Sequence, residues 1–197
     1  LKVRQNGCLS LADSVLVTVN PLPATPVLMT NAPVCQGQDL VFTTTANCGT
    51  YHWTAPNGIT VTTIVPVLTV TSTNALYLPG LWQVVCEDTT TGCISLPSVP
   101  VNAVIYPVPL AIADNGGNVC QGQPVMLYGN TVPGTLPGTL YTWYSDATLT
   151  TIVSTAQNPV LNNIAAGTHT YYLVVTVNGC TSAAAMTTLT VYSVPAA

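Results

Sequence analysis

The sequence predicts an all-β protein built from tandem antiparallel β-sandwiches, and three observations carry that prediction. Short runs of β-branched and aromatic residues are bounded by glycine, proline and asparagine, which is typical of strands. Helical periodicity is absent, and 16 prolines with 14 glycines disfavour long helices. The third observation is a repeat, because Val19, Ile105 and Val191 in three similar valine-rich runs are spaced 86 residues apart.

Two further markers share this period. The tetrapeptide CQGQ begins at Cys35 and again at Cys120, and a Gly-Cys dipeptide ends at Cys8, Cys93 and Cys180. Three sets of landmarks in one phase indicate domains of about 86 residues in tandem.

The phase of the repeat predicts the domain boundaries. One domain is expected at 23–107 and a second at 108–197, whereas residues 1–22 match only the last part of a unit. We expect residues 1–22 to be the closing hairpin of a preceding, incomplete repeat in a longer array. A donated-strand arrangement is the alternative.

Each domain is expected to contain about seven strands. In the first they are predicted near 26–32, 39–46, 50–55, 59–64, 67–72, 80–88 and 95–105. In the second they are predicted near 109–113, 124–130, 139–145, 149–154, 158–163, 169–177 and 183–192. The third strand of each carries a tryptophan, Trp53 or Trp143, and a buried tryptophan at this place is typical of immunoglobulin-like sandwiches.

The seven cysteines indicate disulfides formed in an oxidising compartment, because none belongs to a CxxC pair that would hold a metal. The second unit contains only Cys120 and Cys180, which are therefore expected to bond each other. By equivalence of position Cys35 pairs with Cys93, which leaves Cys48 for Cys86. Cys8 is expected to have its partner upstream.

The same reasoning explains the recurrence of CQGQ. Its cysteine is expected to anchor the start of the sandwich to the last hairpin. The glycine permits a turn or bulge between the first two strands, and the glutamines are polar turn residues.

Charge excludes several classes of function. Only 4% of residues are charged, and the only basic residues are Lys2 and Arg4. A chain without a basic patch does not bind nucleic acid or an anionic membrane by electrostatics. No apolar run reaches the length of a membrane-spanning helix.

No catalytic, cofactor-binding or metal-binding residues are predicted. Neither His52 nor His169 lies near an obvious nucleophile or carboxylate, and the adjacent Glu87 and Asp88 would point to opposite faces of a strand. A calcium ion at the 87–92 loop is the weaker alternative, since such sites usually gather several carboxylates. We therefore expect a protein that is not an enzyme and has no cofactor.

Four motifs carry a resemblance to a known family. They are VCQGQPVML, YTWYS, THTYYLVVTVNGCTS and TTLTVY, all in the second repeat. Together they resemble the immunoglobulin-like repeats of very large surface proteins in gliding Bacteroidetes. Residues 108–195 fit closely. Residues 24–107 fit with departures at Thr54 and Trp82 and with the additional Cys48 and Cys86.

The resemblance implies export through the type IX system, association with gliding motility and assembly into long cell-surface adhesins or filaments. It also draws attention to Asp13-Ser14-Val15 and Asp88-Thr89-Thr90, which match the acceptor pattern for O-glycosylation in such bacteria. Ser14 and Thr89 are the expected acceptors, and chance matches in a chain rich in serine and threonine are the alternative.

The expected function is structural, as a repeat segment of an extracellular, cell-surface filament or stalk-like adhesin. Its expected partners are the neighbouring repeats of the same chain, further copies in a fibre, and surface glycans. One alternative is a glycan- or protein-binding module that uses Tyr51, Tyr141 and Tyr144 as a platform. The other is an accessory domain of a secreted hydrolase.

Overall fold

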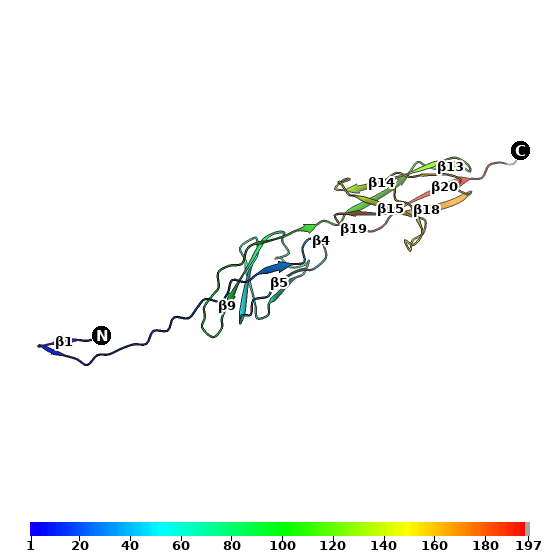
Figure 1. Cartoon of the computed structure of the whole chain (residues 1–197). Coiled ribbons are helices and arrows are strands. Elements are labelled where there is room, and N and C mark those ends of the chain that lie inside the picture. The colour runs from blue at the N-terminus through cyan, green and yellow to red at the C-terminus, as the bar shows by residue number, and fades with distance from the viewer. Residues whose placement is uncertain (196–197) are drawn as a thin grey trace. The chain divides into compact units, whose positions relative to one another are not determined.

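The computed structural model describes residues 1–195, which form two compact units made of β-strands (Figure 1). The first comprises Leu1–Asn31, Val41–Val70 and Ala75–Ala103, and the second comprises Ala32–Leu40, Thr71–Asn74 and the chain from Val104 onwards. Residues 32–40 and 71–74, which the repeat assigns to the first domain, thus cluster with the second unit. The predicted all-β class is confirmed. Positions 196 and 197 of the expected second domain lie outside the described residues.

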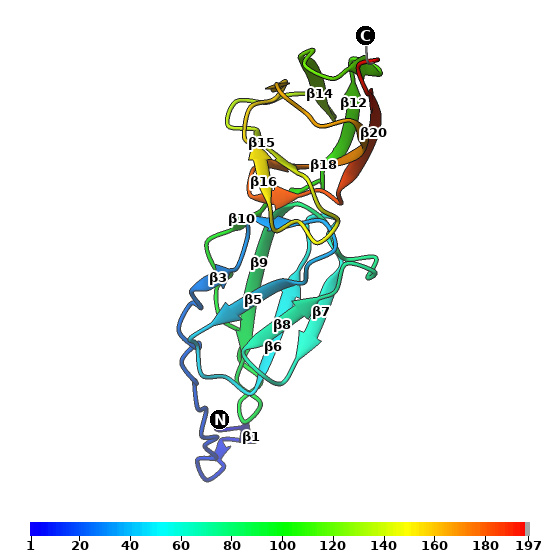
Figure 2. The same cartoon turned by 90° about the vertical axis from the view of Figure 1, so that its right-hand side faces the viewer.

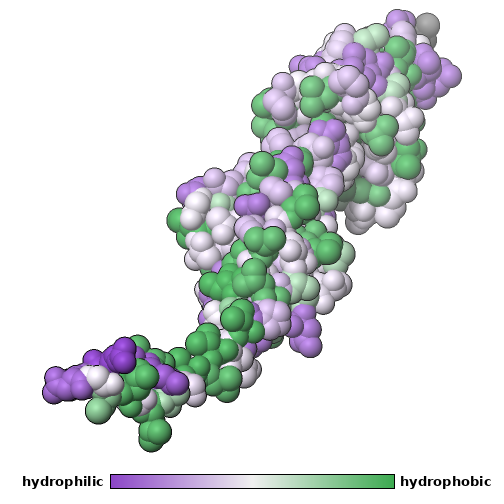
Figure 3. Space-filling model, turned by 60° about the vertical axis from the view of Figure 1, so that its left-hand side comes forward, coloured by the Kyte–Doolittle hydropathy of each residue, from purple (hydrophilic) through white to green (hydrophobic). Residues whose placement is uncertain are grey.

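The chain begins with a two-residue hairpin. Strand β1 (Arg4–Gln5) pairs with β2 (Cys8–Leu9), and Asn6 and Gly7 between them have φ angles of 48° and 83°. These left-handed conformations are what a tight hairpin turn requires. The valine-rich run that follows forms no strand, and its apolar side chains are exposed (Figure 3). Its backbone has no neighbouring strand among the described residues to pair with.

Two sheets build the first unit (Figure 2). The three-stranded sheet has the order β3 (Leu28–Thr30), β5 (Leu40–Thr44), β8 (Val67–Val70). The four-stranded sheet has the order β10 (Val101–Ala103), β9 (Gly80–Glu87), β6 (Thr50–Thr54), β7 (Thr60–Thr63). Burial alternates along β5, β6 and β9, so every second side chain faces the core. Phe42 and Trp82 meet in that core with ring centroids 4.4 Å apart.

The second unit repeats this plan with longer strands. One sheet has the order β12 (Leu110–Asn115), β14 (Val125–Val132), β17 (Val160–Leu161). The other has the order β13 (Val119–Cys120), β20 (Ala185–Tyr192), β18 (Gly167–Val177), β15 (Leu140–Tyr144), β16 (Ile152–Ser154), with β19 (Cys180–Thr181) added to β18. A separate parallel pair consists of β4 (Val34–Cys35) and β11 (Ile105–Tyr106). The core is lined by alternate residues of β14, β15, β18 and β20.

Both third-strand tryptophans are buried, as predicted. Trp53 on β6 and Trp143 on β15 have no exposed surface. The indole N–H of Trp53 donates to the hydroxyl of Thr63 at 2.9 Å, and that of Trp143 donates to the carbonyl of Gln157 at 3.2 Å. A buried indole needs such an acceptor. Its N–H has lost its hydrogen bond to water, and leaving it unpaired would destabilise the fold.

Candidate functional site: the cysteine-bearing ends of the repeats

The first CQGQ segment forms a tight turn directly after a short strand, which pairs in parallel with another. Cys35 on β4 lies opposite Tyr106 on β11, and the next residue, Gln36, donates its backbone N–H to the Tyr106 carbonyl at 2.8 Å. The Gln38 N–H then returns to the Cys35 carbonyl at 3.0 Å. Gly37 inside the turn has a φ of 98°, which only glycine adopts without strain.

The second CQGQ segment has the same geometry. Cys120 on β13 lies opposite Tyr192 on β20, and Gln121 donates to the Tyr192 carbonyl at 2.8 Å. Gln123 donates to the Cys120 carbonyl at 3.0 Å, and Gly122 has a φ of 89°. The turn role predicted for the glycines is therefore confirmed.

The glutamines behave as turn residues where the structure shows their contacts. The side-chain oxygen of Gln38 accepts the backbone N–H of Cys35 at 3.2 Å. This bond fixes the cysteine backbone before the turn.

The Gly-Cys segments form the opposite kind of end, a hairpin closed by a serine. In the second unit Cys180 pairs with Val177 across Asn178 and Gly179, whose φ angles are 51° and 80°. Two residues after the cysteine, Ser182 donates its N–H to the Val175 carbonyl at 2.9 Å. Its hydroxyl accepts the Val175 N–H at 3.0 Å. We call this pair of bonds the serine clamp.

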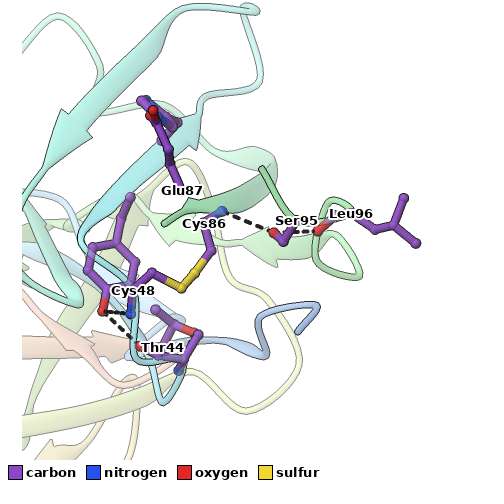
Figure 4. The surroundings of a disulfide bond; sticks show 9 residues. Thr44, Cys48, Cys86, Glu87, Ser95 and Leu96 are labelled. Atoms are coloured by element: carbon purple, nitrogen blue, oxygen red, sulfur yellow. Dashed lines mark hydrogen bonds and ion pairs between the residues drawn. A yellow bond between two sulfur atoms is a disulfide. The ribbon is translucent and has the colours of Figure 1, made fainter. Parts of the chain in front are cut away.

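The serine clamp occurs after all three Gly-Cys segments. Ser10 follows Cys8 and makes the same two bonds with Val3, at 2.9 and 3.0 Å. Ser95 follows Cys93 and makes them with Cys86, at 2.8 and 3.0 Å (Figure 4). The spacing Cys-x-Ser is visible in the sequence, but only the structure shows what the serine holds.

The disulfides differ from the predicted set. The structure joins Cys35 to Cys180, with their Cα atoms 5.6 Å apart, and both residues belong to the second compact unit. The expected pairs Cys35–Cys93 and Cys120–Cys180 are therefore replaced, and Cys93 and Cys120 remain thiols.

Strand register explains why a bond between Cys120 and Cys180 does not form. Cys120 follows Val119, which pairs with Val191, and Val191 pairs with Gly167 at the start of β18. Cys180 pairs with Val177, at the other end of the same strand. Ten residues of extended strand span about 33 Å, whereas a disulfide tolerates a Cα separation of up to about 7 Å.

Cys48 and Cys86 are joined, the pair expected by elimination, with Cα atoms 5.8 Å apart (Figure 4). Cys86 is fully buried on β9. It donates to the serine clamp of the first unit as Val175 does to that of the second. The hydroxyl of Tyr51 accepts the Cys48 N–H at 3.1 Å and donates to the Ala46 carbonyl at 2.8 Å. This bond thus reinforces the inside of the first unit.

Cys8 is an exposed thiol in the structure. It occupies the position after an Asn-Gly turn that Cys180 occupies in the second unit. A partner upstream stays a prediction.

His52 has a carboxylate neighbour, contrary to expectation. Its Nε2 lies 2.8 Å from Oε2 of Glu87 on β9, and its Nδ1 lies 3.0 Å from the hydroxyl of Thr62 on β7. The two residues are 35 positions apart in the sequence, so this cross-strand contact could not be predicted without the strand register.

The Glu87–His52–Thr62 row lacks what a nucleophilic site needs. A hydroxyl nucleophile works beside donors that bind the developing oxyanion, but the backbone groups around Thr62 are paired in the β6–β7 ladder. The row is a partly exposed cross-strand contact, worth at most about 1 kcal/mol.

Two of the three tyrosines proposed as a sugar platform belong to the core. Tyr51 and Tyr141 are 2% and 5% exposed. The Tyr141 hydroxyl lies 2.7 Å from that of Thr135. Tyr144 is half-buried, so a platform of all three side chains does not exist.

The loop after β9 is organised by Asp88. Its Oδ1 accepts the N–H groups of Thr90 at 2.8 Å and Thr91 at 3.4 Å, and the Thr90 bond in particular lowers the pKa of Asp88 below its ordinary value. Within residues 1–195 no group of three or more acidic, histidine or cysteine side chains could hold a metal ion. Asp88 therefore caps a turn.

Both predicted glycosylation positions, Ser14 and Thr89, are exposed. Thr89 packs over Gly49 beside a hollow of about 540 Å³ that also contacts Asp88. Modification at either position stays a prediction.

A family model matches the second repeat. Residues 107–195 match the family model of the Ig-like domain described as CHU_C associated. This stretch has an Ig-like fold. The two disulfide bonds of the chain and this fold indicate a secreted or extracellular protein with a structural or binding role. Within residues 1–195 no helix is long and apolar enough to cross a membrane.

One of the similar solved structures shares the fold at a TM-score above 0.5. A marsupial T cell receptor is 12% identical with a TM-score of 0.58, over 88% of this chain and 74% of that chain. Fibronectin(III)-like modules of Clostridium thermocellum CbhA are 8% identical with a TM-score of 0.46, over 85% of this chain and 95% of that chain.

Three N-terminal domains of the highly immunogenic outer capsid protein of bacteriophage RB49 are 17% identical with a TM-score of 0.42. That match covers 86% of this chain, which spans 59% of the phage chain. No curated protein matches the chain in sequence.

Proposed function

We propose that this chain is a non-enzymatic structural segment of an extracellular, cell-surface filament or stalk-like adhesin. One observation carries the proposal: the disulfide from Cys35 in the first sequence repeat to Cys180 in the second. A bond of this kind makes the two repeats covalently continuous at a second point besides the backbone. An array of repeats under tension benefits from that continuity.

The organisation of the repeats supports the same function. The CQGQ turn occurs twice and the serine clamp three times with matched hydrogen bonds, so each repeat presents one end of each kind. Residues 1–22 carry only the second kind, in keeping with the closing hairpin of a preceding repeat. Neighbouring repeats of the same chain are the proposed partners, with fibre formation by further copies. Export by a type IX system and a link to gliding follow from the family resemblance.

A binding module is the second candidate, and one observation favours it. The hollow beside Asp88 and Thr89 is the kind of concave surface that a ligand needs, and Pro21, Leu22 and Pro23 form its other wall. The loss of Tyr51 and Tyr141 to the core weakens the glycan form of this candidate.

Electron microscopy of the native material separates the two candidates. A filament with regularly spaced beads, dispersed by neither salt nor glycans, is the result expected for a structural segment. Compact single particles, combined with saturable binding of the chain on an array of surface glycans, would overturn the structural proposal. A chain with Thr89→Ala serves as the control for glycans attached to the protein itself.

A further inference from the structure

The three thiols left in this chain occupy positions that are bonded elsewhere in the same chain. Cys120 is the counterpart of Cys35, since both precede a positive-φ glycine in a CQGQ turn and lie opposite a tyrosine on a parallel strand. Cys93 and Cys8 are counterparts of Cys180, since all three lead into a serine clamp. The bond Cys35–Cys180 therefore joins one CQGQ cysteine to one Gly-Cys cysteine.

No partner for Cys120 exists inside its own repeat. Cys180 lies at the far end of β18 and is already bonded to Cys35. The observed bond connects a repeat with the one that follows it, over a sequence separation of 145 residues. Applied to Cys120, the same rule requires a Gly-Cys cysteine about 145 residues further on.

We infer that Cys120 and Cys93 are inter-repeat disulfide sites, each taking a cysteine of a neighbouring repeat. Cys120 takes the cysteine of a following Gly-Cys-x-Ser hairpin, and Cys93 takes the cysteine of a preceding Cys-x-Gly turn. Cys8 follows the rule for Cys93. One bond links each repeat to the next, and the odd number of cysteines results from partners that belong to other repeats.

Exposure agrees with this assignment. Cys120 is exposed and Cys93 is partly exposed, so both thiols can be reached by a partner. Bonded Cys180, by contrast, is 1% exposed.

The chemistry requires an oxidant of the disulfide class, either a thiol–disulfide oxidoreductase or a small-molecule disulfide. One thiolate attacks the oxidant and forms a mixed disulfide, and the second thiolate displaces the remaining half. Two thiols lose two protons and two electrons in total, and the oxidant leaves as two thiols.

Disulfide mapping of the native protein tests the inference. Material is isolated without reductant, treated with N-ethylmaleimide to block free thiols, cut with pepsin and analysed by tandem mass spectrometry. We expect a peptide with Cys120 linked to a Gly-Cys peptide and a peptide with Cys93 linked to a Cys-x-Gly peptide, neither carrying maleimide. Links Cys35–Cys93 and Cys120–Cys180, or maleimide on Cys93 and Cys120, would overturn the inference.

Reduction distinguishes two sources of the partner cysteine. If it lies in the same chain, the denatured mass is unchanged by reductant. If it lies in a second copy, reductant lowers that mass to one chain. Both results support the inference, since the partner motif is the same.

A variant pair makes the test specific. Cys120→Ser should leave one further Gly-Cys cysteine open to maleimide, while Cys35–Cys180 and Cys48–Cys86 remain. The matched control, Cys48→Ser, should expose Cys86 alone. The inference fails if Cys120→Ser exposes no new cysteine. None of these readouts depends on whether the array forms a filament. The inference can therefore be refuted while the proposed function stands, and the proposed function can be refuted while the inference stands.

Discussion

At the scale of single residues, glycine forms the turns at the ends of each repeat and serine holds the closing hairpin. Cysteine joins one end to another through a disulfide. The turn glycines could be predicted, because a glycine that recurs between polar residues is typical of a turn that needs a positive φ. The serines were not predicted, because Cys-x-Ser becomes meaningful only when the strand that the serine reaches is known. Tyr51 and Tyr141 were assigned to the surface as one alternative, since alternation alone does not say which face of a strand is buried.

Gly122→Ala should destabilise the second unit. The backbone at Gly122 has a φ of 89° with nothing within 4 Å of an added Cβ, so the cost is conformational, about 1–2 kcal/mol. Urea denaturation followed by tryptophan fluorescence measures it.

The matched control for this change is Gly116→Ala. Its added Cβ would lie 3.5 Å from the nearest atom, an ordinary contact, and Gly116 has no positive φ. The control should shift the free energy of unfolding by less than about 0.5 kcal/mol. Equal losses in the two variants would contradict the turn assignment.

At the scale of elements, hairpins and turns decide which strands pair and how firmly. Alternating residues predicted the strands and their buried tryptophans. The disulfide pairing could not be predicted from the cysteine positions, because a repeat with two cysteines does not reveal that they lie at opposite ends of β18. The contact between His52 and Glu87 was missed for the same reason, since register across 35 residues is a tertiary property.

Ser182→Ala should weaken the closing hairpin. The Val175 N–H that its hydroxyl accepts is buried, and an unpaired buried N–H costs about 1–3 kcal/mol. Hydrogen exchange at Val175 should accelerate and the unfolding midpoint should fall. Ser10→Ala removes the same bond from an exposed hairpin and should change neither unit. A midpoint unaffected by Ser182→Ala would show that the clamp contributes nothing.

The turn after β15 should make stability depend on pH. The Thr148 hydroxyl, and then the N–H groups of Thr151 and Thr150 at 2.7 and 3.1 Å, hold the pKa of Asp146 well below its usual range. A carboxyl with a lowered folded pKa stabilises the fold above its unfolded pKa of about 3.9 and loses that contribution as pH falls further.

Asp146→Asn therefore should lower the Tm at pH 6, and the difference from the unmodified chain should shrink below pH 4. Thermal unfolding measured between pH 2 and 7 tests this. Asp114→Asn is a control for the general loss of one negative charge. A Tm difference that does not change with pH would contradict the role of the Asp146 carboxylate.

At the scale of the whole molecule, the repeat predicted two sandwiches, and the structure adds a covalent link between their sequences. The bond Cys35–Cys180 encloses most of both repeats in one loop. The local sequences of CQGQ and Gly-Cys do not indicate that their cysteines bond across a repeat boundary. The disulfide pairing could therefore be determined only from the three-dimensional structure.

The loop should be visible when single molecules are pulled from both ends. With the bond intact, residues between Cys35 and Cys180 cannot be extended by the force. Reduction should release the 145-residue separation, about 500 Å at the length of an extended chain. Without reductant, Cys35→Ser should show that length less the 38 residues that Cys48–Cys86 still closes, and Cys48→Ser should show no such release. A gain of only about 38 residues on reduction of the unmodified chain would show that the bond Cys35–Cys180 is absent.

Under tension this bond changes what breaks first. Force that enters at one terminus passes from sulfur to sulfur and bypasses the chain between Cys35 and Cys180. The strands from β5 to β18 are thereby shielded from the pull, whereas β3 and β20 lie outside that loop and still carry it. If every repeat is linked to the next in this way, stretching is limited to the 27-residue segments that run from a Gly-Cys cysteine to the next CQGQ cysteine, such as Cys93 to Cys120. Such a protein would extend by a limited amount and then resist with covalent bonds, until a reductant reaches it.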